Sequence, residues 1–174
     1  MKENTDKIDV LTFGCRLNTY ESEVMRSHAK DADVGESVII NTCAVTAEAE
    51  RQARQAIRKA KKNNPSAKII VTGCAVQVNP DAFKSMPEVD QIIGNDVKLK
   101  REAWSPTAEK IQLNDIMSVR ETASHLIEGM DGHARAFLQV QNGCDHRCTF
   151  CIIPYGRGNS RSVPPADIVA QVQK

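Results

Sequence analysis

The sequence predicts an α/β fold built on a doubly wound parallel sheet. Short apolar runs recur through the first hundred residues, and stretches with helical spacing lie between them. Strands that alternate with helices form βαβ units, whose strands are parallel. The runs are almost continuously apolar, which is typical of strands buried on both faces. The predicted strands are 8–13, 37–42, 68–73 and, more weakly, 90–94.

Two long helices are predicted between these strands, at 17–30 and 46–64, and a shorter one near 80–86. In the second, Thr46 can cap the first turn and Pro65 follows the last one. Basic side chains crowd its end, where they suit the helix dipole; the same charges could also contact an RNA backbone. Both interpretations stay open for Arg51, Arg54, Arg58, Lys59, Lys61 and Lys62.

The hydrophobic pattern divides the chain into three parts. Residues 1–103 hold the predicted α/β domain, 104–134 show little periodicity and are predicted to be a connector, and 135–174 open a second domain. The last part begins with an alternating run predicted as a strand, 135–141, and ends in a predicted helix, 164–174. It carries five basic and two acidic side chains and three of the six cysteines, which indicates a separate functional unit.

The composition excludes several classes of protein. The 174 residues carry a net charge of +1, so the whole chain lacks the electrostatic signature of a nucleic-acid or membrane binder. The apolar runs are too short to span a membrane, and the polar N-terminus lacks the apolar segment of a secretory signal. We therefore expect a cytoplasmic protein. In that reducing compartment, six cysteines indicate metal or redox chemistry before disulfides.

Three cysteines, Cys15, Cys43 and Cys74, each follow a predicted strand. The carboxyl ends of parallel strands share one edge of a sheet, with neighbouring strands about 4.8 Å apart, so these thiolates could converge on one inorganic centre. Gly14 and Gly73 permit a close backbone approach beside them. A single cysteine at a strand end is more often simply buried, but repetition at three corners favours a shared metal site.

The other three cysteines, Cys144, Cys148 and Cys151, form the pattern C-x3-C-x2-C within one loop. Three thiolates at this spacing can bind a four-iron cluster and leave one iron without a protein ligand. A structural zinc site normally needs four ligands, and His146 as the fourth would make a cramped tetrahedron. An open iron suits a cluster that binds a chelating substrate.

With Phe150 just before its last cysteine, this loop resembles the signature of radical S-adenosylmethionine enzymes. The segments GCRLNTYESE, NTCAVT, VTGCAVQ and NGCDHRCTFCIIPYGRG together resemble the methylthiotransferases of that group. The resemblance implies a flavodoxin- or Rossmann-like methylthiotransferase domain, followed by the beginning of a radical S-adenosylmethionine partial βα barrel. It also implies S-adenosylmethionine and two 4Fe-4S clusters, an auxiliary one on Cys15, Cys43 and Cys74 and a radical one on Cys144, Cys148 and Cys151.

Among the branches of this family, the motifs look most like the one that methylthiolates C2 of N6-threonylcarbamoyladenosine at position 37 of tRNA. Arg16, Leu17 and Ala44–Val45–Thr46 fit the isopentenyladenosine-tRNA and ribosomal-protein branches less well, although both stay open. The resemblance implies that one S-adenosylmethionine methylates sulfur at the auxiliary cluster and a second supplies the radical for transfer. The implied partners are tRNA with its anticodon-loop adenosine 37, a sulfur donor, and an electron donor such as flavodoxin or ferredoxin.

Other side chains near the second triad are candidates for cofactor binding. We predict that Phe150 and Tyr155 pack near the adenine of the cofactor, and that Arg157 and Arg161 contact a carboxylate or phosphate. Because only the start of the second domain is present, we expect an N-terminal piece that is inactive alone. The alternatives are a non-catalytic iron–sulfur protein for electron transfer or sensing, and a structural zinc or thiol protein.

Overall fold

A five-stranded parallel sheet forms the centre of the computed structural model, which describes residues 8–121 and 135–174. The predicted α/β class is confirmed. The strands follow chain order across the sheet, without the reversal of order that defines the switch point of flavodoxin-like and Rossmann sheets. They are β1 (Ile8–Thr12), β2 (Ser37–Thr42), β3 (Lys68–Gly73), β4 (Gln91–Ile93) and β5 (Ile111–Gln112).

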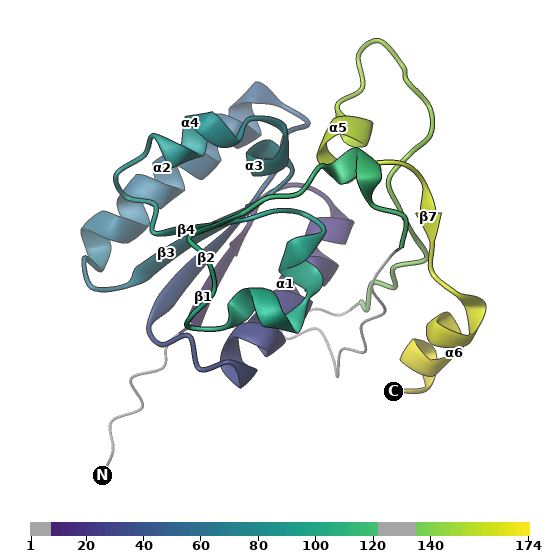
Figure 1. The fold of residues 1–174 in the computed structure, drawn as a ribbon, viewed down its shortest axis with the longest axis horizontal. Helices are drawn as coiled ribbons and strands as arrows, with labels where there is room; N and C mark the ends of the chain where they lie inside the picture. The colour runs from purple at the N-terminus through teal and green to yellow at the C-terminus, as the bar shows by residue number, and fades with distance from the viewer. Residues whose placement is uncertain (1–7, 122–134) are drawn as a thin grey trace.

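Helices cover both faces of the sheet (Figure 1). One face carries α2 (Ala47–Asn63), α3 (Cys74–Val78) and α4 (Pro80–Lys84). The other carries α1 (Arg16–Asp31) and two short 3-10 helices, η1 (Val97–Leu99) and η2 (Arg101–Trp104). The helices predicted from the sequence are confirmed, and the Ala49 N–H donates to the Thr46 side chain at 3.1 Å as the capping pattern predicts.

The core consists of two apolar layers separated by the sheet. Alternate residues of β2 face opposite sides, so Val38 and Ile40 pack with Ile57 of α2, while Ile39 packs with Met25 of α1. All six residues of β2 are buried. The runs at 37–42 and 68–73 therefore mark strands covered on both faces, whereas β1, at the edge of the sheet, is partly exposed.

The sheet extends into the segment predicted as a connector. β5 pairs in parallel with β4, with Ile111 opposite Ile92. Trp104 is buried in the α1-side core and donates its indole N–H to the Lys98 carbonyl at 2.9 Å. A strand of two residues is too short to show as a period in the sequence. Residues 122–134 of the predicted connector lie outside the described residues.

The strand predicted at 135–141 is wrong for nearly all of its length. Only Gln141–Asn142 forms a strand, β6, which pairs antiparallel with β7 (Arg161–Ser162). Leu138 and Val140 are exposed, so the alternation does not mark a buried face here. After the cysteine loop come α5 (Ile153–Arg157) and α6 (Pro165–Gln173), the second of which confirms the predicted terminal helix. Among the described helices, none is both long and apolar enough to cross a membrane.

Candidate metal centre at the carboxyl edge of the sheet

The structure brings the three N-terminal cysteines together at one edge of the sheet. Cys15 precedes α1, Cys43 follows β2, and Cys74 begins α3 directly after β3. Burial raises the pKa of the Cys43 thiol; the neighbouring thiols of Cys74 and Cys15 raise it further, against a hydrogen bond from the Val45 N–H that lowers it. The Cys43 thiol thus lies within electrostatic range of both of the other thiols, as the strand-end pattern predicts.

Two glycines make this close approach possible. Gly14 has a φ of +108°, and a Cβ placed on it would lie 2.8 Å from the Cys43 Sγ. Gly73 has a φ of +102°, and its Cβ would lie 2.3 Å from the Thr42 carbonyl oxygen. Any other residue would be strained at these angles and would push the corners apart. The predicted role of both glycines is confirmed.

Asn18 ties two of the corners to each other. Its side-chain N–H group donates to the Phe13 carbonyl at 2.7 Å and to the Thr42 carbonyl at 3.1 Å, which are the residues just before Gly14 and Cys43. Asn18 is buried, so these bonds form away from water, where an unmade bond would be costly. The corners are held by a side chain that the sequence analysis did not single out.

The second cysteine triad lies on the loop between β6 and α5. The Cys144 N–H donates to the Gly158 carbonyl at 3.0 Å, which closes the loop, and the Cys151 N–H donates to the Cys148 carbonyl at 3.0 Å. Arg147 bridges the loop by donating to the Cys144 carbonyl at 2.9 Å. Cys148 is exposed and the other two thiols are half-buried, so all three face accessible space.

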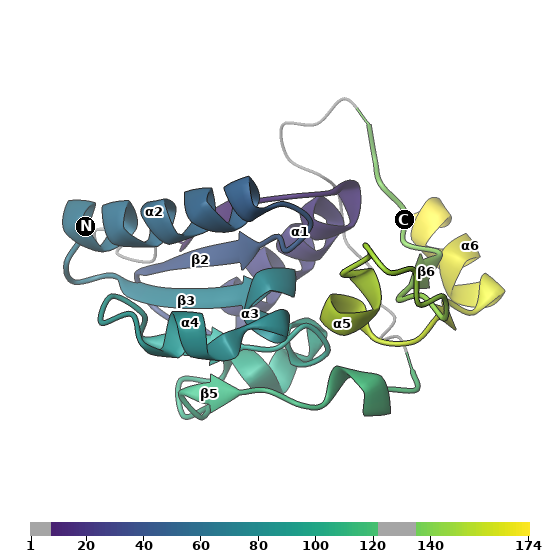
Figure 2. The same cartoon turned by 90° about the horizontal axis from the view of Figure 1, so that it is seen from above.

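The loop is attached to the sheet edge next to the first triad. Figure 2 shows α5 beside α3, at the end of the sheet toward which β2 and β3 point. Gly156 of α5 packs against Cys74: a Cβ on Gly156 would lie 3.1 Å from the Cys74 Cβ. Asn95 donates to the Cys74 Sγ at 3.5 Å and also to the Gly156 carbonyl. The two triads therefore belong to one end of the molecule.

A buried ion cluster lies beneath this contact. Glu21 accepts from Lys98 Nζ at 2.7 Å and from Arg157 Nη1 and Nη2 at 2.6 and 3.0 Å. Burial by itself would raise the pKa of the Glu21 carboxyl, but the charges of Arg157 and Lys98 outweigh it and lower the pKa to about 2. Arg157, predicted to contact a cofactor anion, thus has a carboxylate of this chain as its partner.

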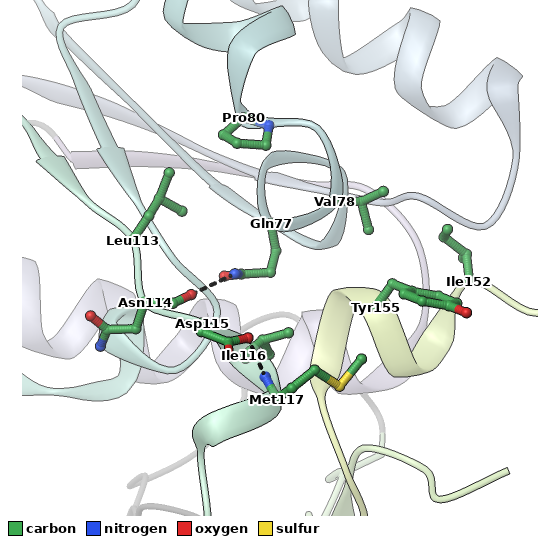
Figure 3. Close-up of a pocket in the computed structure, with 10 residues that line it drawn as sticks. All are labelled: Gln77, Val78, Pro80, Leu113, Asn114, Asp115, Ile116, Met117, Ile152 and Tyr155. Atoms are coloured by element: carbon green, nitrogen blue, oxygen red, sulfur yellow. Dashed lines mark hydrogen bonds between the residues drawn. The ribbon is translucent and has the colours of Figure 1, made fainter. Parts of the chain in front are cut away.

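The other candidate side chains have different surroundings. Phe150 is 90% exposed, while Tyr155 is 52% exposed and borders a pocket of about 630 Å³ together with Ile152. Figure 3 shows Tyr155 and Ile152 on one side of this pocket and Gln77 of α3 on another. Arg161 is buried and donates to the carbonyls of Asn159 and Arg157 at 2.9 and 2.8 Å.

The side chains offer the donors of an iron–sulfur site without forming a closed site for one ion. Within residues 8–121 and 135–174, no group of three or more His, Cys, Asp and Glu side chains is near enough to hold a metal ion. In a four-iron cluster each thiolate ligates a different iron, so the sulfurs need not converge on one atom. Three thiols at one glycine-lined edge of the sheet fit the ligand set of a four-iron cluster.

Comparison with known proteins places this arrangement in a family. A family model described as "Uncharacterized protein family UPF0004" matches residues 7–94, which contain the first three cysteines, the four longer strands and α1 to α4. The chain belongs to this family.

Three relatives of this chain are named for tRNA methylthiolation. One from Rickettsia prowazekii, named threonylcarbamoyladenosine tRNA methylthiotransferase MtaB, is 59% identical over 170 residues, covering 98% of this chain and 40% of the relative. One of the same name from Aquifex aeolicus is 35% identical and covers 96% of this chain and 44% of the relative. A tRNA-2-methylthio-N(6)-dimethylallyladenosine synthase from Flavobacterium johnsoniae is 30% identical, over 98% of this chain and 39% of the relative. The resemblance to methylthiotransferases is confirmed, and the chain spans about two fifths of the length of these relatives.

Sequence analysis missed the residues that join the two halves of the candidate site, namely Asn18, Glu21, Lys98 and Asn95. A signal for two of them exists. Asn18 and Glu21 are three residues apart, on the same buried face of α1 as Val24 and Met25. Polar residues at core positions of an amphipathic helix indicate a buried partner, although the sequence does not say which one.

Proposed function

We propose that the complete protein is a cytoplasmic, radical S-adenosylmethionine-dependent tRNA methylthiotransferase. Its substrate is N6-threonylcarbamoyladenosine 37, whose C2 hydrogen is replaced by a methylthio group. The observation that carries the proposal is the placement of two cysteine triads at one end of a parallel sheet, in a chain 59% identical to a relative named for that activity. tRNA, a sulfur donor and an electron donor of the flavodoxin or ferredoxin type are the partners.

In this proposal each triad holds one 4Fe-4S cluster. Cys15, Cys43 and Cys74 hold the auxiliary cluster, and the loop triad, in what would be the start of a radical S-adenosylmethionine domain at 135–174, holds the second. When bound, the clusters and S-adenosylmethionine supply the sulfur, the methyl group and the radical that an unactivated aromatic C–H bond requires. The chain itself supplies thiolate ligands, a fixed spacing between the triads, and an apolar wall.

The apolar wall is the side of the pocket that Tyr155 and Ile152 line. Tyr155 and Ile152 present half-exposed apolar surface next to the last cysteine of the loop, and Gln77 adds an amide. The ring of Tyr155 suits one face of the adenine of S-adenosylmethionine, and Gln77, whose amide already donates to the Asn114 carbonyl and accepts from the Asn95 N–H, lines the pocket beside it. The exposed ring of Phe150 is available to the same ligand or to a further part of the protein.

The basic face of α2 has less free charge than the sequence indicates. Arg51 pairs with Glu48 at 2.6 Å, Arg54 pairs with Glu50, and Lys61 pairs with Asp90 at 3.0 Å. The remaining basic residues, Arg58, Lys59 and Lys62, are all exposed. We propose a solvated helix face here and keep tRNA contact as the competing interpretation, which predicts a salt-dependent loss of affinity when these three charges are removed.

The decisive experiment measures iron and acid-labile sulfide after anaerobic reconstitution. Two clusters would give about eight irons per chain, and about four would remain when either triad is changed to alanine. His146→Ala is the matched control, because it removes a potential ligand from the same loop without touching a thiol. Stoichiometric zinc without sulfide would contradict the proposal and favour a structural zinc protein. Clusters whose spectra do not respond to S-adenosylmethionine would favour a non-catalytic electron carrier.

The tRNA branch is tested in the complete protein by nucleoside mass spectrometry. Cells that lack the endogenous activity should recover methylthiolated threonylcarbamoyladenosine when the gene is restored. Recovery of methylthiolated isopentenyladenosine instead would support the second branch, to which the Flavobacterium johnsoniae relative belongs by name. Modification of a ribosomal protein in place of tRNA would support the third.

A further inference from the structure

The buried ion cluster joins two parts of the chain that are far apart in sequence. Glu21 lies on α1 and Lys98 on η1, whereas Arg157 is the last residue of α5. The exposed fractions of Glu21, Lys98 and Arg157 are 0%, 0% and 6%. The charged groups therefore meet where α5 leaves no access for water.

Arg157 can be buried there only because its donors are satisfied. Two donate to Glu21, and others reach the side-chain oxygens of Asn142, at 3.1 Å, and Asn18. A guanidinium without such partners would be driven back to water, because an unpaired charge buried in the protein interior is strongly destabilising. Docking of α5 and formation of the Glu21–Arg157 pair are thus one event.

Glu21 still has a partner, Lys98, when α5 is not docked against the sheet. Lys98 belongs to the same side of the sheet and bonds Glu21 independently of Arg157. The Glu21–Lys98 pair is neutral by itself, so it can remain buried within the N-terminal part. Loss of Arg157 should therefore weaken the attachment of α5 without destabilising the N-terminal part, where Lys98 still pairs with Glu21.

The segment that Arg157 anchors touches both cysteine triads. The preceding residue, Gly156, packs against Cys74, and the carbonyl of the following residue, Gly158, accepts from the Cys144 N–H at 3.0 Å. Three consecutive residues therefore connect the first triad, the ion cluster and the second triad. A displacement of Arg157 changes the position of the cysteine loop relative to Cys74.

We propose that Glu21 and Arg157 form a positioning lock that holds residues 156–158, and with them the C-x3-C-x2-C loop, against the Cys74 corner. Glu21 acts through Arg157 and touches no thiol, so it is a positioning residue. The lock sets the spacing between the two triads; its value for methylthio transfer rests on the proposed function, but its existence does not.

The test compares thiol protection in Arg157→Gln and wild type, in the full-length protein, reduced and freed of metal. Iodoacetamide labelling of each cysteine is followed by peptide mass spectrometry. We expect labelling of Cys74 to accelerate by about tenfold or more when the lock is removed, because α5 no longer covers it. Labelling of Cys43, which lies behind Gly14, should stay unchanged, because the Glu21–Lys98 pair remains.

Arg54→Gln is the matched control, since it makes the same chemical change in an ion pair with Glu50 that is partly exposed on α2. It should leave the labelling of both thiols unchanged. Arg157→Lys keeps the charge but loses the forked donor, and should restore part of the Cys74 protection. In reconstituted protein, the magnetic interaction between the two reduced clusters should weaken in Arg157→Gln and recover in Arg157→Lys.

Equal labelling of Cys74 in wild type and Arg157→Gln would overturn the lock. An equal acceleration at Cys74 and Cys43 would also overturn it, because the ion pair would then support the whole domain rather than the attachment of α5. If wild type binds no iron but shows the expected Cys74 protection, the proposed function fails and the lock stands.

Discussion

Gly73 is the residue whose replacement tests the cysteine corner most directly. It has a φ of +102° and a ψ of −173°, a region of backbone space that is essentially restricted to glycine. In Gly73→Ala the new Cβ would lie 2.3 Å from the Thr42 carbonyl oxygen and 2.4 Å from the Thr42 nitrogen. Both are backbone atoms of β2, so no side-chain rotation can relieve the overlap.

The expected cost has two parts. Backbone strain contributes about 1 to 2 kcal/mol, and displacement of β2 from β3 contributes about 1 to 3 kcal/mol more, as overpacking does in other cores. Gly35→Ala separates them, because Gly35 also has a positive φ, +74°, but no atom lies within 4 Å of its Cβ position. It should lose the strain component alone.

The assay is urea unfolding of both variants beside wild type, followed by circular dichroism. Gly73→Ala should lose about 2 kcal/mol more than Gly35→Ala, which corresponds to a melting temperature lower by roughly 4 to 8 °C in a chain of this length. Equal losses in the two variants would refute the reasoning, because the corner beside Cys74 would then tolerate a side chain.

Three further predictions concern the ion cluster and α2. Glu21 has its pKa lowered from 4.5 to about 2 in the folded state, so its contribution to stability is present above pH 4.5 and is lost as the pH falls toward 2. That contribution is roughly 3 kcal/mol. Urea unfolding should show that the free energy of unfolding falls less between pH 7 and pH 3 in Glu21→Gln than in wild type, and an equal fall in both would contradict this role of Glu21. Lys98→Met removes a buried positive charge that interacts with Cys74, while the Glu21–Arg157 pair remains. The proposed auxiliary cluster should then be harder to reduce, its potential falling by on the order of tens of millivolts in a redox titration, whereas Lys100→Met at an exposed position should leave the potential unchanged. Thr46→Ala removes the cap of α2 and should lower the free energy of unfolding by about 1 kcal/mol, whereas Thr46→Ser keeps a hydroxyl and should retain most of that stability. Equal free energies of unfolding in the two variants would show that the cap is dispensable.

The sequence predicted the layered fold well because its signals are local. The runs at 37–42 and 68–73 have apolar centres, and each coincides with a whole strand that is buried except at Lys68. Capping by Thr46 depends on residues within one turn, so a sequence pattern contains it. The run 135–141 alternates between apolar and polar residues, yet only its last residue is in a strand, because a strand also needs a partner at the right distance.

The place of the first triad was also determined by the sequence. Parallel strands end at one edge whatever their order, so three cysteines that follow three strands must share that edge. The glycines beside them, at 14 and 73, indicated the tight corners that the structure contains. This inference needed only the positions of the strand ends.

What only the tertiary structure decided is how the second triad meets the first. Glu21 and Arg157 are 136 residues apart, and nothing in the local pattern around either residue names the other. Arg157 looked like a ligand for an outside anion because sequence shows charge but not burial. Pairing of buried charges depends on which surfaces come together, and that is settled when α5 docks on α3 and excludes water from the carboxylate.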